Sequence, residues 1–169
     1  MRVGVFGAGA VGGYLGSRLS AAGVPVTLVG RGAILEAKDD LVAVPTRGRL
    51  SPLAPDAVVT ADPTALADVS VCLVTVKSRD TETAGQTLAE VLSPDTVVVS
   101  FQNGLHNAEI LGRHLGRSVV QGVVSYNVRW DDQHRIHQAT TGKLYAGALQ
   151  EPGRAALDWL VEALSLIHI

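Results

Sequence analysis

A glycine-rich stretch close to the start of the chain has the spacing of a phosphate-binding turn. It follows the pattern G-x-G-x-x-G and consists of Gly7, Ala8, Gly9, Ala10, Val11 and Gly12. The first glycine of such a turn permits a sharp change of direction, and the second lets the backbone approach a pyrophosphate because it has no Cβ atom. The third allows the following helix to pack closely on a sheet. Free N–H groups at the start of that helix then attract phosphates.

The flanking residues predict the elements that such a turn requires. The apolar run "RVGVFG" predicts a strand before the turn, and Val11, Leu15 and Leu19 are spaced as one face of a helix after it. Gly23 stands where a helix commonly ends, and "VPVTLVG" predicts a second strand. The motif alone also suits a purely structural turn, but between a strand and a helix it favours dinucleotide binding. A secretory signal is disfavoured, because glycines weaken the helix that a signal peptide needs.

Arg31 indicates which dinucleotide is bound. It follows the second predicted strand in "LVGRG", at the position where an acidic residue would accept hydrogen bonds from the ribose 2′-hydroxyl of NAD. A guanidinium suits a 2′-phosphate instead. The alternative is a solvent-exposed residue at the start of a helix, where a cation is mildly unfavourable. The sequence therefore predicts NADP(H) as the cofactor.

Two further predicted strands end on polar side chains. "VSVCLVTVK" ends at Lys77, and "TVVVSFQNG" ends at Gln102, Asn103 and Gly104. Because parallel strands release the chain at one edge of a doubly wound sheet, Lys77, Asn103 and the glycine turn are expected to meet there. A lysine and an amide at this edge could polarise a carbonyl group or hold a carboxylate. Taken separately, Lys77 could equally cap a strand and Asn103 could belong to an ordinary turn.

The remaining reactive side chains carry weaker signals. Strand alternation in "DDQHRIHQA" would put His134 and His137 on opposite faces, which is a poor geometry for a metal site. His106 and His114 could share one face of a predicted helix, where a surface or interfacial role is expected. Cys72 is interpreted as a small core residue within a buried strand. The sequence predicts no metal site.

The composition predicts a Rossmann-like α/β protein with a doubly wound, mainly parallel sheet. Of the 169 residues, 47% are hydrophobic and only 4% aromatic, so the core must consist mostly of valine, leucine and alanine. The formal net charge of −2, without a basic stripe, argues against binding to nucleic acids or a membrane surface. No apolar run is long enough to span a bilayer. The single cysteine cannot form an internal disulfide, which favours the cytoplasm.

Two segments stand outside this alternating pattern. Residues 41–60 contain three prolines and "RGR", which predict irregular hairpin material. Near the end, "RAALDWLVEAL" predicts a helix whose apolar face comprises Leu157, Leu160, Val161 and Leu164. The closing "LSLIHI" resembles the translation of a transposon adapter used in sequencing libraries. We therefore expect an NADP-binding domain at residues 1–163 and a non-native tail at residues 164–169.

Four motifs, in this order, resemble the ketopantoate reductases (2-dehydropantoate 2-reductases). They are "GAGAVGGYLGSRL", "VGRG", "VTVK" and "SFQNG". Further on, "VVQGVVSYNVRW" and "HQATTGKLYAGAL" resemble the strands that close the N-terminal domain of that family, so the resemblance covers nearly the whole chain. It implies NADPH-dependent reduction of 2-dehydropantoate, a small 2-oxo acid, to pantoate, on the route to pantothenate and coenzyme A.

The resemblance also implies roles for individual residues. The glycine turn and Arg31 would bind NADP, and Lys77 and Asn103 would lie between the nicotinamide and the substrate. The backbone near Val128 would approach the cofactor. The family has a second, helical domain that supplies a proton-donating lysine and a substrate-holding glutamate. This domain is expected to be missing here, so the chain alone would be inactive, and a homodimer of the full-length protein is left open.

Two other functions remain open from the sequence. The chain could belong to another Rossmann reductase or dehydrogenase that acts on a different 2-oxo or 3-hydroxy acid. It could also be a regulatory domain that senses a nucleotide without catalysis. A sensor would not need Lys77 and Asn103 beside the nicotinamide, so protection of these two residues by a substrate analogue would separate the alternatives.

Overall fold

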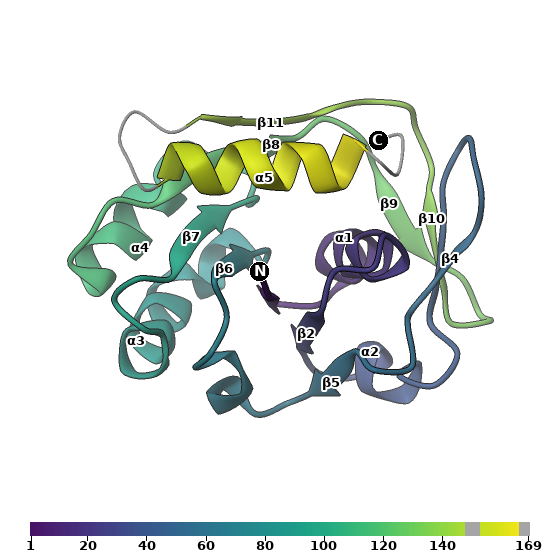
Figure 1. Ribbon diagram of the computed structural model, residues 1–169, viewed down its shortest axis with the longest axis horizontal. Coiled ribbons are helices and arrows are strands. Elements are labelled where there is room, and N and C mark those ends of the chain that lie inside the picture. Colours follow the sequence, from purple (N-terminus) through teal and green to yellow (C-terminus); the bar gives the residue numbers. More distant parts are fainter. Residues whose placement is uncertain (148–152, 166–169) are drawn as a thin grey trace.

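A seven-stranded sheet forms the centre of the computed structural model, which describes residues 1–147 and 153–165 (Figure 1). Its strands are β1 (Val3–Phe6), β2 (Val26–Val29), β5 (Val58–Thr60), β6 (Val71–Val74), β7 (Val97–Ser100), β8 (Val120–Val124) and β11 (Leu144–Gly147). The spatial order is β11-β8-β7-β6-β1-β2-β5. All neighbouring pairs are parallel except β8 and β11, which are antiparallel.

The direction in which the sheet grows reverses at β1. The chain proceeds from β1 through β2 to β5 on one side, and then adds β6, β7 and β8 on the other side. This is the doubly wound topology of a Rossmann-like fold, so the predicted fold class is confirmed. The reversal opens a crevice between the carboxyl ends of β1 and β6, where ligands of such sheets bind.

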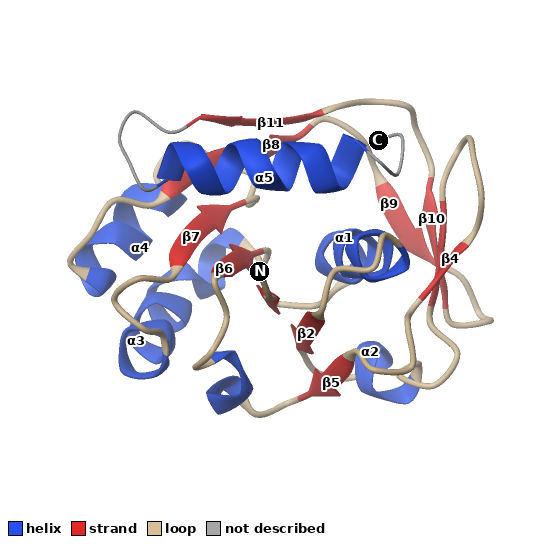
Figure 2. Cartoon of the chain, viewed as in Figure 1, coloured by secondary structure: helices blue, strands red, loops and turns tan. Residues whose placement is uncertain are grey.

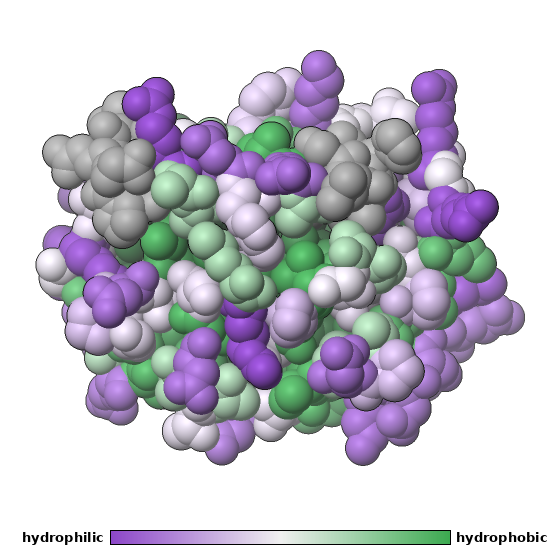
Figure 3. Space-filling model, viewed as in Figure 1, coloured by the Kyte–Doolittle hydropathy of each residue, from purple (hydrophilic) through white to green (hydrophobic). Residues whose placement is uncertain are grey.

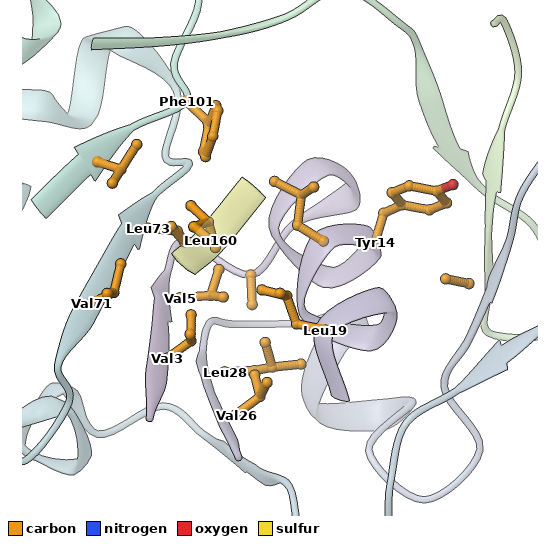
Figure 4. Close-up of a cluster of buried hydrophobic side chains, with 14 of the residues drawn as sticks. Val3, Val5, Tyr14, Leu19, Val26, Leu28, Val71, Leu73, Phe101 and Leu160 are labelled. Atoms are coloured by element: carbon orange, nitrogen blue, oxygen red, sulfur yellow. The ribbon is translucent and has the colours of Figure 1, made fainter. Parts of the chain in front are cut away.

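Helices cover both faces of this sheet (Figure 2). They are α1 (Ala10–Ala21), α2 (Ala33–Glu36), α3 (Thr81–Val91), α4 (Asn107–Leu115) and α5 (Gly153–Ser165), with the short 3-10 helices η1 (Pro63–Leu66) and η2 (Ser78–Asp80). On one face, α1 and α5 contribute Leu19 and Leu160 to a buried cluster with the strands (Figure 4). On the other face, α3 and α4 contribute Leu88 and Leu111 to a second cluster.

Strand β6 shows why the central strands are continuously apolar. Val71 and Leu73 point into the cluster under α1 and α5, whereas Cys72 and Val74 belong to the cluster under α3 and α4. Since alternate side chains enter opposite cores, no position on the strand tolerates a polar residue without cost. The prediction of a central, fully buried strand in "VSVCLVTVK" is confirmed, although the strand ends at Val74, ahead of Lys77.

A second sheet packs against α1 on the side away from β1. Its strands are β3 (Val42–Val44), β4 (Ser51–Pro52), β9 (Val128–Trp130) and β10 (Arg135–Gln138), in the order β4-β3-β10-β9. The approach is close, because a Cβ atom on Gly13 of α1 would lie 2.6 Å from Ile136 Cδ1. The expected hairpin within residues 41–60 is present as β3 and β4. The end of that segment, however, forms β5 and joins the main sheet beside β2.

Helix α5 buries a face that differs in one position from the predicted one. Leu157 and Leu160 are buried as expected, but Val161 is 58% exposed, so its assignment to the apolar face is wrong. Ala156 and Ala163 are buried instead and lie on the other flank of Leu160. The prediction relied on the large apolar side chains and left out the alanines, which contribute little apolar area. The centre of the predicted face was therefore shifted too far toward Val161. The side chain of Leu164 lies outside the described residues.

The expected non-native tail at residues 164–169 lies mostly outside the described residues and stays a prediction.

In the view of Figure 3, hydrophilic residues gather at the rim and apolar residues are visible nearer the centre of the face. Among the described residues, no helix combines the length and the apolar character that crossing a membrane requires.

Candidate functional site

The glycine turn joins β1 to α1 in a tightly fixed conformation. Gly7 has a φ of +95°, a region that residues with a side chain rarely adopt. A Cβ atom on Gly7 would also lie 2.6 Å from the backbone nitrogen of Val76. The N–H groups of Gly7 and Ala8 both donate to the carbonyl of Val29, at 2.9 Å. The turn is therefore held between the ends of β2 and β6.

Gly9 and Gly12 of the same turn have different surroundings. Gly9 is exposed and precedes the first residue of α1, and the nearest atom to a Cβ built on it is the Gly7 carbonyl oxygen at 3.9 Å. Gly12 is buried, and its Cβ would lie 2.8 Å from Val5 Cγ1 and 2.9 Å from the Gly7 oxygen. Gly9 thus presents bare backbone to open space, whereas Gly12 allows α1 to lie against the sheet.

The start of α1 is open to an anion. The first N–H groups of a helix have no intrahelical acceptor. No side chain caps α1 at Gly9, and its first turn has no acidic residue. Within the described chain, therefore, neither a capping side chain nor an acidic residue of the first turn offsets the partial positive charge of this helix end.

Arg31 lies next to this turn. It follows β2 and Gly30, and a Cβ on Gly30 would lie 3.2 Å from the Ala8 Cβ, so this part of the chain touches the turn directly. The Arg31 residue is exposed, and its guanidinium makes no ion pair or hydrogen bond with the described parts of the chain. An exposed cation without a partner among the described residues is available to a ligand phosphate.

Lys77 and Asn103 are brought to the same edge. Lys77 lies three residues beyond the end of β6, and Asn103 lies three residues beyond the end of β7. The hydroxyl of Ser78 donates to the Asn103 carbonyl at 2.5 Å and so connects the two loops. The Thr75 hydroxyl donates to the Gly7 carbonyl at 2.8 Å and connects the β6 end to the glycine turn. The expected meeting of the three strand ends is therefore present in the backbone.

The arrangement fits a dinucleotide in two respects. The Cβ position at Gly9 has open space around it, and the first turn of the adjoining helix has no acidic residue. Two exposed cations, Arg31 and Lys77, lie along the same edge without protein partners in the described residues. The chain itself thus leaves both charge and space for an anionic ligand with more than one phosphate.

The other residues considered from the sequence lie elsewhere. Val128 is the first residue of β9 in the second sheet and pairs with Gln138, outside the group of strand ends. Cys72 is fully buried, and burial raises the pKa of its thiol to about 12, which makes it an unreactive core residue.

The described histidines each lie beside a carboxylate. The pairs are His106 with Glu109, His114 with Glu82, His134 with Asp40 and His137 with Asp131. His134 lies in a turn before β10, with a φ of +56°, so strand alternation does not describe His134 and His137. In residues 1–147 and 153–165, no three histidine, cysteine, aspartate or glutamate residues gather as a metal site would require.

Sequence reasoning missed two buried polar residues near Lys77 and Asn103, and it named Gln102 only as part of a strand end. Thr81 is the first residue of α3, Asn107 is the first residue of α4, and Gln102 follows β7. All three are buried and hydrogen-bonded to the two loops. Polar residues are common at the first position of a helix, so residue type did not single these three out. The one feature of the sequence that could have pointed to them is their short distance along the chain from the ends of β6 and β7.

A cavity of about 490 Å³ lies at the opposite edge of the sheet and is separate from this site. Its lining includes Met1, Val71 and Val97, which stand at the amino ends of β1, β6 and β7. The carboxyl edge is the one that carries Arg31, Lys77 and Asn103, all of which are exposed.

Comparison with known proteins agrees with this geometry. Residues 3–151 match the family described as "Ketopantoate reductase PanE/ApbA". The chain is 34% identical over 163 residues to the 2-dehydropantoate 2-reductase of Archaeoglobus fulgidus, covering 96% of this chain and 52% of that protein. It is 28% identical to the enzyme of the same name from Halobacterium salinarum, covering 98% of this chain and 55% of that protein.

A solved structure extends the agreement to three dimensions. The PanE/ApbA family ketopantoate reductase from Ralstonia eutropha has a TM-score of 0.84 and 28% identity, over 97% of this chain and 54% of that one. The chain thus spans about half the length of the relatives that it matches. The family match begins at the first residue of β1 and extends beyond β11, so it includes the glycine turn and all the strand ends described above. The chain therefore belongs to the ketopantoate reductase PanE/ApbA family.

Proposed function

We propose that the chain carries the NADPH-binding half of a 2-dehydropantoate 2-reductase, which reduces 2-dehydropantoate to pantoate. The family consists of NAD(P)-dependent oxidoreductases with a Rossmann-like fold. The observation that carries the proposal is the meeting of the glycine turn, Lys77 and Asn103 at one edge of the parallel sheet. In this proposal residues 1–163 form the cofactor-binding domain, and the substrate-binding domain corresponds to the half of the relatives that the chain does not span.

Each group at this edge has a chemical role in the proposal. The N–H groups at the start of α1 bind the pyrophosphate, and Gly9 permits its close approach. NADPH supplies the hydride when it is bound. The Lys77 ammonium and the Asn103 amide donate hydrogen bonds toward the 2-oxo group and the nicotinamide, which orients both and draws electron density from the carbonyl carbon. The Lys77 charge also complements the carboxylate of a 2-oxo acid.

The preference for NADPH over NADH is assigned to Arg31. Arg31 lies beside the turn at the end of β2, and the next acidic residue in the chain is Glu36. The Arg31 guanidinium can form charge-assisted hydrogen bonds with a 2′-phosphate, which NADH lacks. The proposal includes a small 2-oxo acid as the substrate. It also includes the cytoplasm as the compartment, because the chain has a single, buried cysteine and so no internal disulfide.

The test is the substitution Arg31→Ala, with NADPH and NADH titrated into both proteins. A hydrogen bond to a charged group contributes roughly 1.5–3 kcal/mol, so we expect NADPH affinity to fall by about tenfold to a hundredfold. The affinity for NADH should stay nearly unchanged.

Arg154→Ala is the matched control, since Arg154 is an exposed arginine on α5, beside the residues that line the cavity at the opposite edge. Its removal should leave both affinities unchanged. Equal weakening of NADPH and NADH by Arg31→Ala would reject the 2′-phosphate role. Failure of the unaltered chain to bind either nucleotide would reject the proposed function as a whole.

A further inference from the structure

A buried polar network lies directly behind Lys77 and Asn103. Its central members are Thr81, Gln102 and Asn107, and all three are at least 95% buried. The Gln102 side-chain amide donates to the Thr81 hydroxyl at 2.8 Å. The Thr81 hydroxyl lies 2.9 Å from Asn107 Oδ1 and 2.8 Å from the Ser78 carbonyl, and its single hydrogen serves one of these acceptors at a time. The network therefore links α3, α4 and the ends of β6 and β7.

On one side, the network fixes the backbone on both sides of Lys77. The Gln102 amide donates to the carbonyl of Val76 at 3.0 Å. The Thr81 hydroxyl is within hydrogen-bond distance of the carbonyl of Ser78. Because the residues before and after Lys77 are both held, the direction in which its side chain leaves the sheet edge is set by these buried groups.

On the other side, the network fixes the carbonyl of Asn103. This carbonyl accepts hydrogen bonds from the Asn107 amide at 2.7 Å and from the Ser78 hydroxyl at 2.5 Å. The Asn107 amide approaches so closely that a Cβ on Gly104, which has a φ of +115°, would lie 3.1 Å from its nitrogen. The loop that carries Asn103 is thus held to the loop that carries Lys77.

The side chains of Lys77 and Asn103 themselves take no part in this network. Both residues are exposed, and neither side chain has a hydrogen-bond partner in the described residues. Burying polar side chains stabilises a protein less than burying apolar ones would. A buried polar network with satisfied hydrogen bonds instead makes the surrounding backbone rigid and specifies one arrangement of it. Here it fixes the backbone of two residues and leaves their functional groups free, which is the arrangement of a preorganised binding site.

We propose that Thr81, Gln102 and Asn107 are positioning residues of the cofactor site, which hold Lys77 and Asn103 in the arrangement that the nicotinamide half of NADPH requires. This inference rests on the function proposed above. It assigns to the hydroxyl of Thr81 a task at the opposite end of the cofactor from Arg31. Loss of that hydroxyl should therefore weaken contacts with the nicotinamide half and leave the adenosine half bound as before.

The experiment compares NADPH with adenosine 2′,5′-bisphosphate, which carries the 2′-phosphate and the adenosine but no nicotinamide. Both ligands are titrated into the 169-residue chain and into Thr81→Val, which preserves shape but removes the hydroxyl. A misplaced pair of hydrogen-bond donors costs about threefold to tenfold in affinity. We expect NADPH to weaken by this factor, with adenosine 2′,5′-bisphosphate within about twofold, and we expect Thr81→Ser to restore NADPH binding.

A matched control separates positioning from stability. Thr96 is also a buried threonine, its hydroxyl donates to the Val69 carbonyl at 2.9 Å, and it lies at the opposite edge of the sheet. Thr96→Val loses an equivalent buried hydrogen bond and should lower the unfolding temperature comparably, but the ratio of the two affinities should not change. An equal change of that ratio in Thr81→Val and Thr96→Val would overturn the inference.

Lys77→Ala distinguishes failure of the inference from failure of the proposed function. If Lys77→Ala lowers NADPH affinity selectively but Thr81→Val does not, the positioning role is overturned and the proposed site stands. If neither variant changes the ratio of affinities, or if the unaltered chain does not bind NADPH, both proposals are overturned together.

Discussion

Two glycines in the same turn are required for opposite reasons. Gly9 has nothing within 3.9 Å of the position that a Cβ would occupy, so its lack of a side chain serves no packing contact. Gly12 faces Val5 and the Gly7 carbonyl at less than 3 Å, so its lack of a side chain is a condition of folding. One motif therefore contains one glycine that packing requires and one that packing does not require, and the proposed cofactor contact accounts for the second.

The first prediction separates these two roles by alanine substitution. In Gly12→Ala the clash costs roughly 1–3 kcal/mol, and over most of this range it outweighs the roughly 1 kcal/mol that alanine gains in helix propensity, so stability should fall. In Gly9→Ala stability should stay within about 0.5 kcal/mol. NADPH affinity should nevertheless fall about tenfold or more, because the methyl group occupies the side that the pyrophosphate approaches.

Urea unfolding followed by tryptophan fluorescence, together with NADPH titration, measures both effects on the same samples. A Gly9→Ala protein that binds NADPH normally would mean that the pyrophosphate does not approach the turn from this side.

The residues of the site differ in how well the sequence reveals them. The glycines, Arg31, Lys77 and Asn103 could be proposed from the sequence because strand ends in a parallel sheet meet at one edge, whatever the details of the loops. Thr81, Gln102 and Asn107 could not be identified in this way. Each is an ordinary polar residue near the end of an element, and only the distances in the folded chain show that they form one network.

At the scale of elements, α3 and α4 are joined by a close contact between a glycine and a histidine. A Cβ on Gly85 of α3 would lie 3.0 Å from the Cβ of His114 on α4, so the glycine allows the imidazole to pack between the helices. The imidazole then contacts the carboxylate of Glu82 on α3. Since Glu82 directly follows Thr81, this contact connects the start of α3 to α4, the helix that begins with Asn107.

The second prediction concerns the pH dependence of this contact. The hydrogen bond with His114 lowers the pKa of Glu82 below its ordinary value. A depressed carboxyl pKa stabilises the fold above the pKa of the unfolded chain, roughly 4.3, and this stabilisation is lost as the pH falls through the folded-state pKa. The unfolding temperature of the wild-type chain should therefore exceed that of Glu82→Gln above about pH 5, and the difference should shrink toward pH 3.

Glu90→Gln is the control, because Glu90 is an exposed glutamate on the same helix without an ion pair in the described residues. Thermal unfolding across the pH range would measure all three proteins. A difference between the wild type and Glu82→Gln that stays constant down to pH 3 would contradict the assignment.

The elements also differ in how far the sequence determines them. The parallel strands β1, β2, β6 and β7 are continuous apolar runs followed by turns, and local pattern suffices to find them, whereas β5 was expected as hairpin material. The second sheet is built from strands of two to four residues, and β10 pairs in parallel with β3, which lies more than 90 residues earlier. No local pattern encodes that pairing, because it depends on α1 lying between the two sheets.

The molecule as a whole has two apolar cores and one functional edge. The cores on the two faces of the sheet bury its strands, and the carboxyl ends of β1, β2, β6 and β7 carry every group assigned to the cofactor. In the described residues Arg31, Lys77 and Asn103 are all exposed at this edge. Such a surface can bind a nucleotide, but it does not exclude water from a reacting carbonyl group.

The last prediction follows from this openness: the 169-residue chain binds NADPH but does not reduce 2-dehydropantoate at a useful rate. Saturation at about 100 times Kd should add roughly 2.7 kcal/mol of stability and raise the unfolding temperature by about 5–10 °C. Turnover should be absent, because a positioned general acid contributes roughly 10²–10⁴-fold and loss of substrate positioning multiplies that deficit. NADPH oxidation followed at 340 nm on the same sample measures turnover. Clear oxidation that depends on 2-dehydropantoate would show that the 169-residue chain includes the proton donor. Lys77, an exposed ionisable group at the same strand edge as Asn103, would be the first to substitute.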